Sequence, residues 1–117
     1  MVKKAALFAF NGEPMCFVHV LLNAFDLKER DYAVTIVIEG SATKLIKEFQ
    51  EHPEQPFAAL YFQARDAGLI DCACLACATK MGAADSAREQ GIELRGEMKG
   101  HPSIGHYLEH GYEVFTF

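Results

Sequence analysis

The sequence predicts one α/β domain over residues 1–117, a three-layer α/β/α arrangement whose five-stranded sheet is mainly parallel. Short apolar runs rich in β-branched residues alternate with longer helical segments, and this alternation is typical of a parallel sheet covered on both faces. Runs such as "TIVI" lack polar positions, as expected for strands buried on both sides. A length of 117 residues fits a single domain.

The first strand and helix are bounded by residues that favour turns and helix starts. "KKAALFAF" (3–10) is apolar enough for a buried strand and is stopped by Asn11-Gly12. Pro14 suits the first turn of a helix, because its missing N–H has no helical partner there. We therefore expect a helix over residues 14–30.

That helix has apolar residues on two faces. One face carries Val18, Leu21, Leu22 and Phe25, and the other carries Phe17, Val20, Ala24 and Leu27. A helix packed on one sheet needs a single apolar stripe. The second face therefore predicts a subunit interface.

The middle of the chain begins with its clearest strand. "YAVTIVIEG" (32–40) is dense in β-branched residues and is closed by Gly40. Ser41 or Thr43 can cap a short helix that runs to Phe49, since a hydroxyl accepts a free helical N–H.

The remaining elements follow the same alternation. A helix over 57–68 ends at Gly68, a natural C-cap. The other expected elements are a strand over 69–74, a helix over 78–90, a weak strand over 92–98, a helix over 101–111 and a final strand over 112–117.

Composition and charge exclude several kinds of partner. The net charge is −5 and no run of lysine or arginine could follow a phosphate backbone, so we expect no direct binding of nucleic acid. The apolar run "AALFAF" is too short for a signal segment or a membrane span. The expected location is the cytoplasm, where thiols stay reduced.

Three of the four cysteines lie within six positions, in "DCACLACATKMG" (71–82). Cys74 is expected to end a strand and Cys77 to enter the first turn of the next helix, where the positive helix end favours a thiolate. Cys74 and Cys77 are therefore the predicted catalytic residues. Cys72 is expected to be a packing residue, as free cysteines often are.

Loops that follow parallel strands gather at one edge of the sheet, which is where ligands bind. Three such loops are expected, at 10–14, 39–43 and 74–79. Backbone N–H groups near Asn11 and Gly12 could stabilise an anion there, and Glu39 could carry a proton. Asn11, Gly12 and Glu39 are the predicted substrate-binding residues.

No metal site or cofactor is assigned from the sequence. A zinc site usually combines two spaced ligand pairs, but the chain has no second CxxC or CxxH, so the fourth ligand would be Cys16, His19 or a distant histidine. His106 and His110 are expected on a solvated or interfacial helix face. Neither a Walker A motif nor a GxGxxG fingerprint occurs.

The order of elements, with a cysteine at the end of the third strand and a glycine eight positions on, resembles the DsrE/DsrF-like family. The resemblance covers essentially the whole chain and implies that family's sheet, with a flavodoxin-like layering. It implies that Cys74 accepts sulfur as a persulfide, and it matches Gly82 to the glycine of an "RG"-like pair, with Met81 in place of the basic residue. It also implies a homo-oligomer, commonly a trimer or hexamer.

These observations predict a cytoplasmic sulfur-handling protein that carries sulfur on Cys74 and exchanges it with a donor or acceptor protein. Cys77 could act as the resolving thiol, attacking the inner sulfur of the persulfide. One alternative is a thiol-disulfide oxidoreductase that uses the Cys74/Cys77 pair, since a CxxC at a helix start also describes such sites. Another is a noncatalytic oligomeric or metal-binding module.

Overall fold

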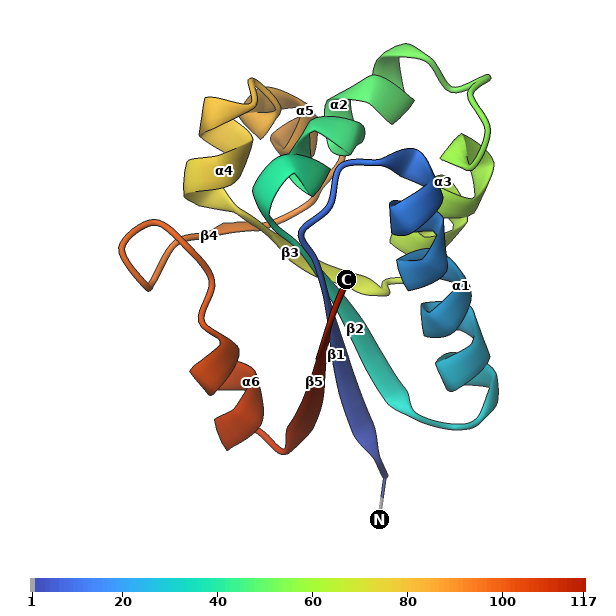
Figure 1. Ribbon diagram of the computed structural model, residues 1–117, viewed down its shortest axis with the longest axis vertical. Coiled ribbons are helices and arrows are strands. Elements are labelled where there is room, and N and C mark those ends of the chain that lie inside the picture. The colour runs from blue at the N-terminus through green and yellow to red at the C-terminus, as the bar shows by residue number, and fades with distance from the viewer. Residues whose placement is uncertain (1) are drawn as a thin grey trace.

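All five strands of the central sheet run parallel in the computed structural model, which describes residues 2–117. Their order across the sheet is β4-β3-β2-β1-β5 (Figure 1). The strands are β1 (Lys4–Ala9), β2 (Ala33–Ile38), β3 (Ile70–Cys74), β4 (Leu94–Arg95) and β5 (Tyr112–Thr116). The predicted α/β class and five-stranded parallel sheet are confirmed.

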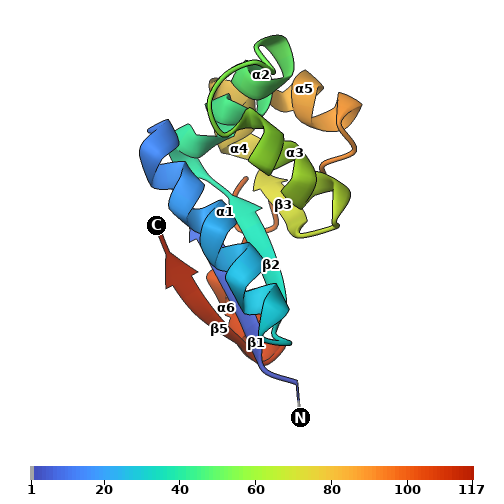
Figure 2. The ribbon, with the colours of Figure 1, turned by 90° about the vertical axis from the view of Figure 1, so that its right-hand side faces the viewer.

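Helices cover both faces of this sheet, but unequally. They are α1 (Pro14–Glu29), the 3-10 helix η1 (Gly40–Thr43), α2 (Lys44–Glu51), α3 (Ala58–Asp66), α4 (Leu75–Lys80), α5 (Ala84–Glu89) and α6 (Ile104–Glu109). Figure 2 shows α1 and α3 in front of the sheet and α6 behind it. Within residues 2–117 no helix is long and apolar enough to cross a bilayer.

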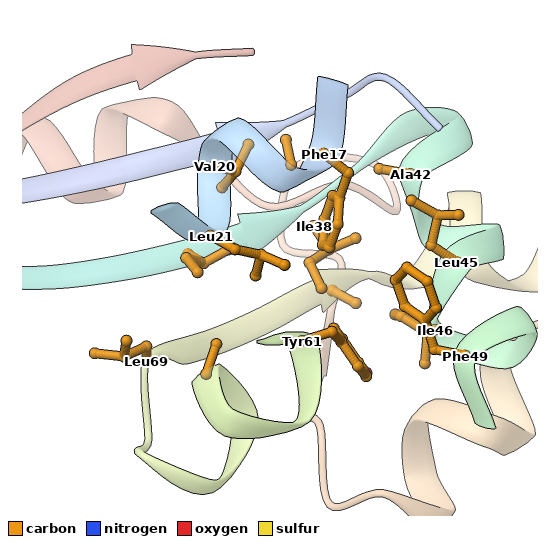
Figure 3. Packing of buried hydrophobic residues seen from close by; sticks show 14 of the residues in the cluster. Phe17, Val20, Leu21, Ile38, Ala42, Leu45, Ile46, Phe49, Tyr61 and Leu69 are labelled. Carbon is orange, nitrogen blue, oxygen red and sulfur yellow. The ribbon is translucent and has the colours of Figure 1, made fainter. Parts of the chain in front are cut away.

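The larger core lies between the sheet and α1, α2, α3 and α5. Phe17, Phe49 and Tyr61 come from three different helices and meet over Ile38 of β2 (Figure 3). Their ring centroids are 5.3–6.4 Å apart. Burying a large apolar side chain contributes about 1.5–3 kcal/mol, so this cluster holds the helical layer onto the sheet.

The smaller core lies beneath α6. Tyr107 of α6 packs edge-on against Phe8 of β1, with ring centroids 5.3 Å apart. Cys72 of β3 is fully buried in the same cluster. The prediction that Cys72 is a packing residue is confirmed, and its sulfur also lies 3.5 Å from the Tyr107 hydroxyl.

The structure differs from the sequence prediction in the region after the cysteines. The helix predicted over 78–90 is two short helices, because Gly82 adopts a left-handed conformation (φ +72°) that stops α4. The strand predicted over 92–98 pairs only at Leu94 and Arg95. The chain beyond β4 is therefore a loop, from 96 to 103, that leads to α6 (Figure 1).

Both apolar faces of α1 are largely used inside the chain. On the second face, three residues are buried and the fourth packs against the core: Phe17, Val20, Ala24 and Leu27. On the first face, Val18 and Leu21 are buried and Phe25 packs against the core, while Leu22 stays half exposed. The fold therefore accounts for most of the apolar surface from which an interface is predicted. The trimer or hexamer stays a prediction.

The loops that follow β1 and β2 are tied together at the carboxyl edge of the sheet. The Gly12 N–H donates to Ser41 Oγ at 2.9 Å, and the Glu39 N–H donates to the Ala9 carbonyl at 2.7 Å. A Cβ at Gly12 would lie 2.5 Å from the Ser41 carbonyl oxygen, so only glycine allows this approach. The contact holds the segment after Glu39 in place.

Candidate functional site

Cys74 lies where β3 becomes α4, as the sequence predicts. It is the N-cap of the helix, and its Sγ accepts a hydrogen bond from the Cys77 N–H at 3.3 Å. The extended backbone of Cys74 (φ −67°, ψ 121°) lets the chain turn within one residue. The i, i+3 spacing then brings the Cys77 side chain to the same edge of the sheet.

Four side chains converge at this point: Glu39, Cys74, Cys77 and His101. One potential ligand atom from each lies within 4.8 Å of all the others. His101 Nδ1 is 3.0 Å from Cys74 Sγ, 3.7 Å from Cys77 Sγ and 3.8 Å from Glu39 Oε1. A single imidazole nitrogen makes one hydrogen bond. The three side chains near His101 Nδ1 therefore surround a common point, which one hydrogen-bonded pair would not explain.

The four side chains come from three separate segments. Glu39 follows β2, Cys74 and Cys77 flank the start of α4, and His101 lies in the loop between β4 and α6. Cys74 and Glu39 are buried, and Cys77 is partly exposed. The His101 side chain is 42% exposed. Solvent therefore reaches the cluster from the side of His101 and Cys77.

The loop that carries His101 is itself ordered by hydrogen bonds. Met98 and His101 exchange backbone hydrogen bonds at 2.8 and 3.0 Å, and the Ala76 N–H donates to the Gly100 carbonyl at 2.9 Å. Gly100 has φ +96°, and a Cβ there would lie 3.0 Å from Ala76 Cβ. The absence of a side chain lets the loop lie directly on α4, which brings His101 over the two cysteines.

Burial opposes negative charge in the cluster. Desolvation raises the pKa of Cys74 from 9.0 to about 12, although the Cys77 N–H favours its thiolate. Desolvation also raises the pKa of Glu39, against the lowering effects of its hydrogen bond with Cys74 and of His101. This shift is opposite in direction to the easy ionisation of Cys74 expected from the sequence, because loss of water outweighs the effect of the helix N-terminus.

The predicted site residues separate into two groups. Cys74, Cys77 and Glu39 are brought together in the cluster. Asn11 instead accepts the Glu13 N–H through its side chain at 2.8 Å, and the N–H of Gly12 is used by Ser41. These bonds give Asn11 and Gly12 a part in loop structure, and their binding of an anion stays a prediction.

His101 is the site residue that sequence reasoning missed. The rule that loops after parallel strands gather at one edge applies also to the loop after β4, but that strand is only two residues long and leaves a weak signal. His19, named from the sequence as a possible fourth zinc ligand, instead borders a cleft of about 390 Å³ with Cys16, Asn23 and Phe117.

Fold and cluster together define a small parallel α/β protein with a mixed thiol, imidazole and carboxylate centre at the carboxyl edge of its sheet. The sequence matches no established family profile. It is 41% identical over 51 residues to an uncharacterized protein of Archaeoglobus fulgidus, covering 44% of this chain and 84% of that protein. The chain belongs to the same family as this Archaeoglobus protein.

Two further similarities extend over most of the chain. The uncharacterized protein MJ0733 of Methanocaldococcus jannaschii is 28% identical over 97 residues, which cover 83% of this chain and 76% of that protein. The structure of BT1422, a conserved protein of unknown function from Bacteroides thetaiotaomicron, superposes with a TM-score of 0.74. That alignment covers 98% of this chain and 95% of BT1422 at 18% identity, so it establishes the fold.

Proposed function

We propose that this protein binds a divalent transition metal, with Zn²⁺ as the best match, through Cys74, Cys77, His101 and Glu39. The observation that carries the proposal is the convergence of four ligand atoms from three segments within 4.8 Å. Two sulfurs, one imidazole nitrogen and one carboxylate oxygen are all ligand types that zinc accepts.

The distances within the cluster support this choice. Neighbouring ligand atoms around a tetrahedral zinc ion lie roughly 3.3–3.8 Å apart, given bonds of about 2.0–2.3 Å. The three distances from His101 Nδ1, at 3.0, 3.7 and 3.8 Å, need shifts of only a few tenths of an ångström to fit. The soft thiols favour zinc over magnesium or calcium, which prefer oxygen ligands.

The charge balance of the cluster points the same way. Burial disfavours the ionised forms of Cys74 and Glu39, and a bound dication would reverse that preference because it stabilises both anions. The cation would also join the segments after β2, β3 and β4. We therefore expect bound metal to raise the stability of the fold.

Metal titration of the chelator-stripped protein tests the proposal, with Co²⁺ as a spectroscopic probe and Zn²⁺ as its competitor. We expect one equivalent to bind with thiolate-to-cobalt absorption. Cys74→Ser, Cys77→Ser, His101→Ala and Glu39→Gln should each weaken binding at least tenfold, about 1.4 kcal/mol. Cys16→Ser is the matched control, since this exposed cysteine lies outside the cluster.

Two results would contradict the metal proposal. One is a wild-type protein that takes up no stoichiometric Co²⁺ or Zn²⁺. The other is loss of binding in Cys16→Ser that equals the loss in Cys74→Ser, because the binding would then not reside in the four-residue cluster.

Sulfur transfer is the second candidate function, and the surroundings of Cys74 Sγ favour it. The Cys77 N–H at 3.3 Å and His101 Nδ1 at 3.0 Å could stabilise a persulfide anion, and the resemblance to the DsrE/DsrF-like family implies this role. Cys74 thiolate would take the outer sulfur of a donor persulfide and release the donor thiolate. Attack by Cys77 on the inner sulfur would then release hydrosulfide and leave a Cys74–Cys77 disulfide.

Intact mass after exposure of the metal-free protein to a persulfide donor separates these functions. A persulfide adds about 32 Da, whereas an internal disulfide, as in a thiol-disulfide oxidoreductase, removes about 2 Da. If Cys74→Ser gained sulfur as fully as the wild type, Cys74 would not be the carrier. If the metal-free protein takes up sulfur and bound Zn²⁺ prevents this uptake, both functions use the same sulfur atoms.

A further inference from the structure

The loop that carries His101 is anchored at both of its ends to a single carboxylate. Arg95, the last residue of β4 before the loop, donates from Nη2 to Asp71 Oδ2. Tyr107, on the helix that follows the loop, donates its hydroxyl hydrogen to the same oxygen. Arg95 also donates to the Tyr107 oxygen, which closes a three-residue network.

Asp71 can make these contacts because of an irregularity in β3. Ile36 pairs with Ile70, but the next residue of β2, Val37, pairs with Cys72. Asp71 is therefore the extra residue of a β-bulge. A bulge changes the direction of a side chain relative to a regular strand, and the Asp71 carboxylate reaches Arg95 and Tyr107 near the layer of α6.

The network is well placed to resist movement. Tyr107 is 3% exposed and packs against Phe8, while the Arg95 side chain is 22% exposed. Burial raises the pKa of Tyr107 above its ordinary value, so its hydroxyl keeps the hydrogen that it donates to Asp71. Hydrogen bonds to a charged group are stronger than those between neutral groups.

Backbone hydrogen bonds order the middle of the loop, so the bonds to Asp71 act mainly on its two ends. β4 pairs with β3 at only two positions. The loop also contains Lys99 and Gly100 at positive φ, and its ordering costs conformational entropy at each residue. Without the bonds to Asp71, both ends of the segment would have more freedom, and so would the His101 imidazole.

We infer that Asp71 is a positioning residue for the metal centre, which it serves by holding the loop of His101 between Arg95 and Tyr107. This inference rests on the proposed metal binding. Asp71 touches none of the four ligand side chains in the contacts described, so it acts through the placement of His101. Groups that hydrogen-bond a metal ligand directly change metal affinity about 10–100-fold, and Asp71 acts one contact further away, so we expect an effect at the lower end of that range.

The test compares Asp71→Asn and Tyr107→Phe with the wild type, and Asp85→Asn is the matched control. Asp85 also pairs with an arginine, Arg88, but on the exposed surface of α5. Competition between Co²⁺ and Zn²⁺ measures affinity, and we expect a loss of about tenfold for Asp71→Asn, a smaller loss for Tyr107→Phe and none for the control.

A double-mutant cycle with His101→Ala separates positioning from general destabilisation. If Asp71 acts through His101, Asp71→Asn should cause little further loss of affinity once His101 is gone. A full and additive loss in the His101→Ala background would overturn the inference, because Asp71 would then support the two cysteines or the fold as a whole.

Hydrogen exchange of the metal-free proteins provides a readout that does not depend on metal. We expect faster exchange of the amides in 96–103 for Asp71→Asn and Tyr107→Phe, with unchanged exchange in β1 and β2. Unchanged exchange in 96–103 for both variants would overturn the inference. If the wild type bound no metal but the amides in 96–103 exchanged faster in the two variants, the proposed metal binding would be wrong and the anchoring role of Asp71 would stand.

Discussion

The ionisation of Cys74 gives the sharpest test of the site, because two physical effects oppose each other there. The Cys77 N–H and the start of α4 favour the thiolate, and burial disfavours it. In the metal-free protein burial prevails and raises the pKa of Cys74 from 9.0 to about 12. At pH 8 a thiol with a pKa of 9 is roughly one-tenth ionised, whereas one with a pKa of 12 is ionised in roughly one molecule per ten thousand.

Alkylation follows the thiolate, so ionisation alone should make Cys74 react about a thousandfold more slowly at pH 8 than a thiol with a pKa of 9. The measurement is iodoacetamide labelling of the chelator-treated protein from pH 7 to 11, followed at each cysteine by peptide mass spectrometry. Cys16 is the exposed reference and Cys72 the buried one. The labelling rate of Cys74 should still be rising at pH 11.

A midpoint for Cys74 at or below pH 9 would refute this reasoning. Burial would then be outweighed by the amide and by His101, and Cys74 would be the activated nucleophile that the sequence predicts. Labelling with Glu39→Gln refines the test, because the Glu39 carboxylate adds to the rise in the Cys74 pKa. That variant should label slightly faster at Cys74.

Three further predictions concern protons and packing. A bound metal must displace the proton of the Cys74 thiol. Below the pKa of Cys74, the Zn²⁺ affinity measured by competition should therefore rise about tenfold per pH unit from this group alone. An affinity independent of pH would exclude Cys74 as a ligand. Burial raises the pKa of Glu39, so the metal-free wild type should lose stability as the pH rises from about 4.5. Thermal unfolding of Glu39→Gln should show no such loss. If the wild type and Glu39→Gln had the same dependence of stability on pH, this prediction would be wrong. Gly12→Ala forces a Cβ to 2.5 Å from the Ser41 carbonyl oxygen and should cost about 1–3 kcal/mol in denaturant unfolding, while Gly105→Ala, whose Cβ meets nothing closer than 3.4 Å, should cost nothing.

Local sequence patterns were enough to predict the sheet because each strand is a run of apolar residues bounded by turn-forming residues. The same patterns failed over 78–90, where a helical composition hides the break at Gly82. A helix continues only while each residue keeps a negative φ, and glycine adopts a positive φ at little cost in free energy, as Gly82 does. The pattern of small and apolar residues alone does not predict whether Gly82 continues the helix or ends it.

Three of the four residues of the candidate site were predictable, for a related reason. Cys74 and Glu39 lie directly at the ends of strong strands and Cys77 lies in the first turn of the next helix, so their place at the carboxyl edge follows from the order of elements. His101 lies six residues beyond a two-residue strand, and its position depends on the contact of Gly100 with Ala76 and on the ends of its loop. These contacts join residues more than twenty positions apart, which no local periodicity encodes.

The amino-acid order by itself determined a parallel α/β domain with two thiols at the end of its third strand, since apolar periodicity and turn residues act over a few neighbours. Only the tertiary structure decided what surrounds those thiols. It removed water from Cys74, which reversed the expected direction of its pKa, and it brought a histidine and a glutamate from other loops to the same point. Desolvation and the convergence of the four side chains both arise from packing between distant segments, and they are the basis for the metal binding that we propose at Cys74.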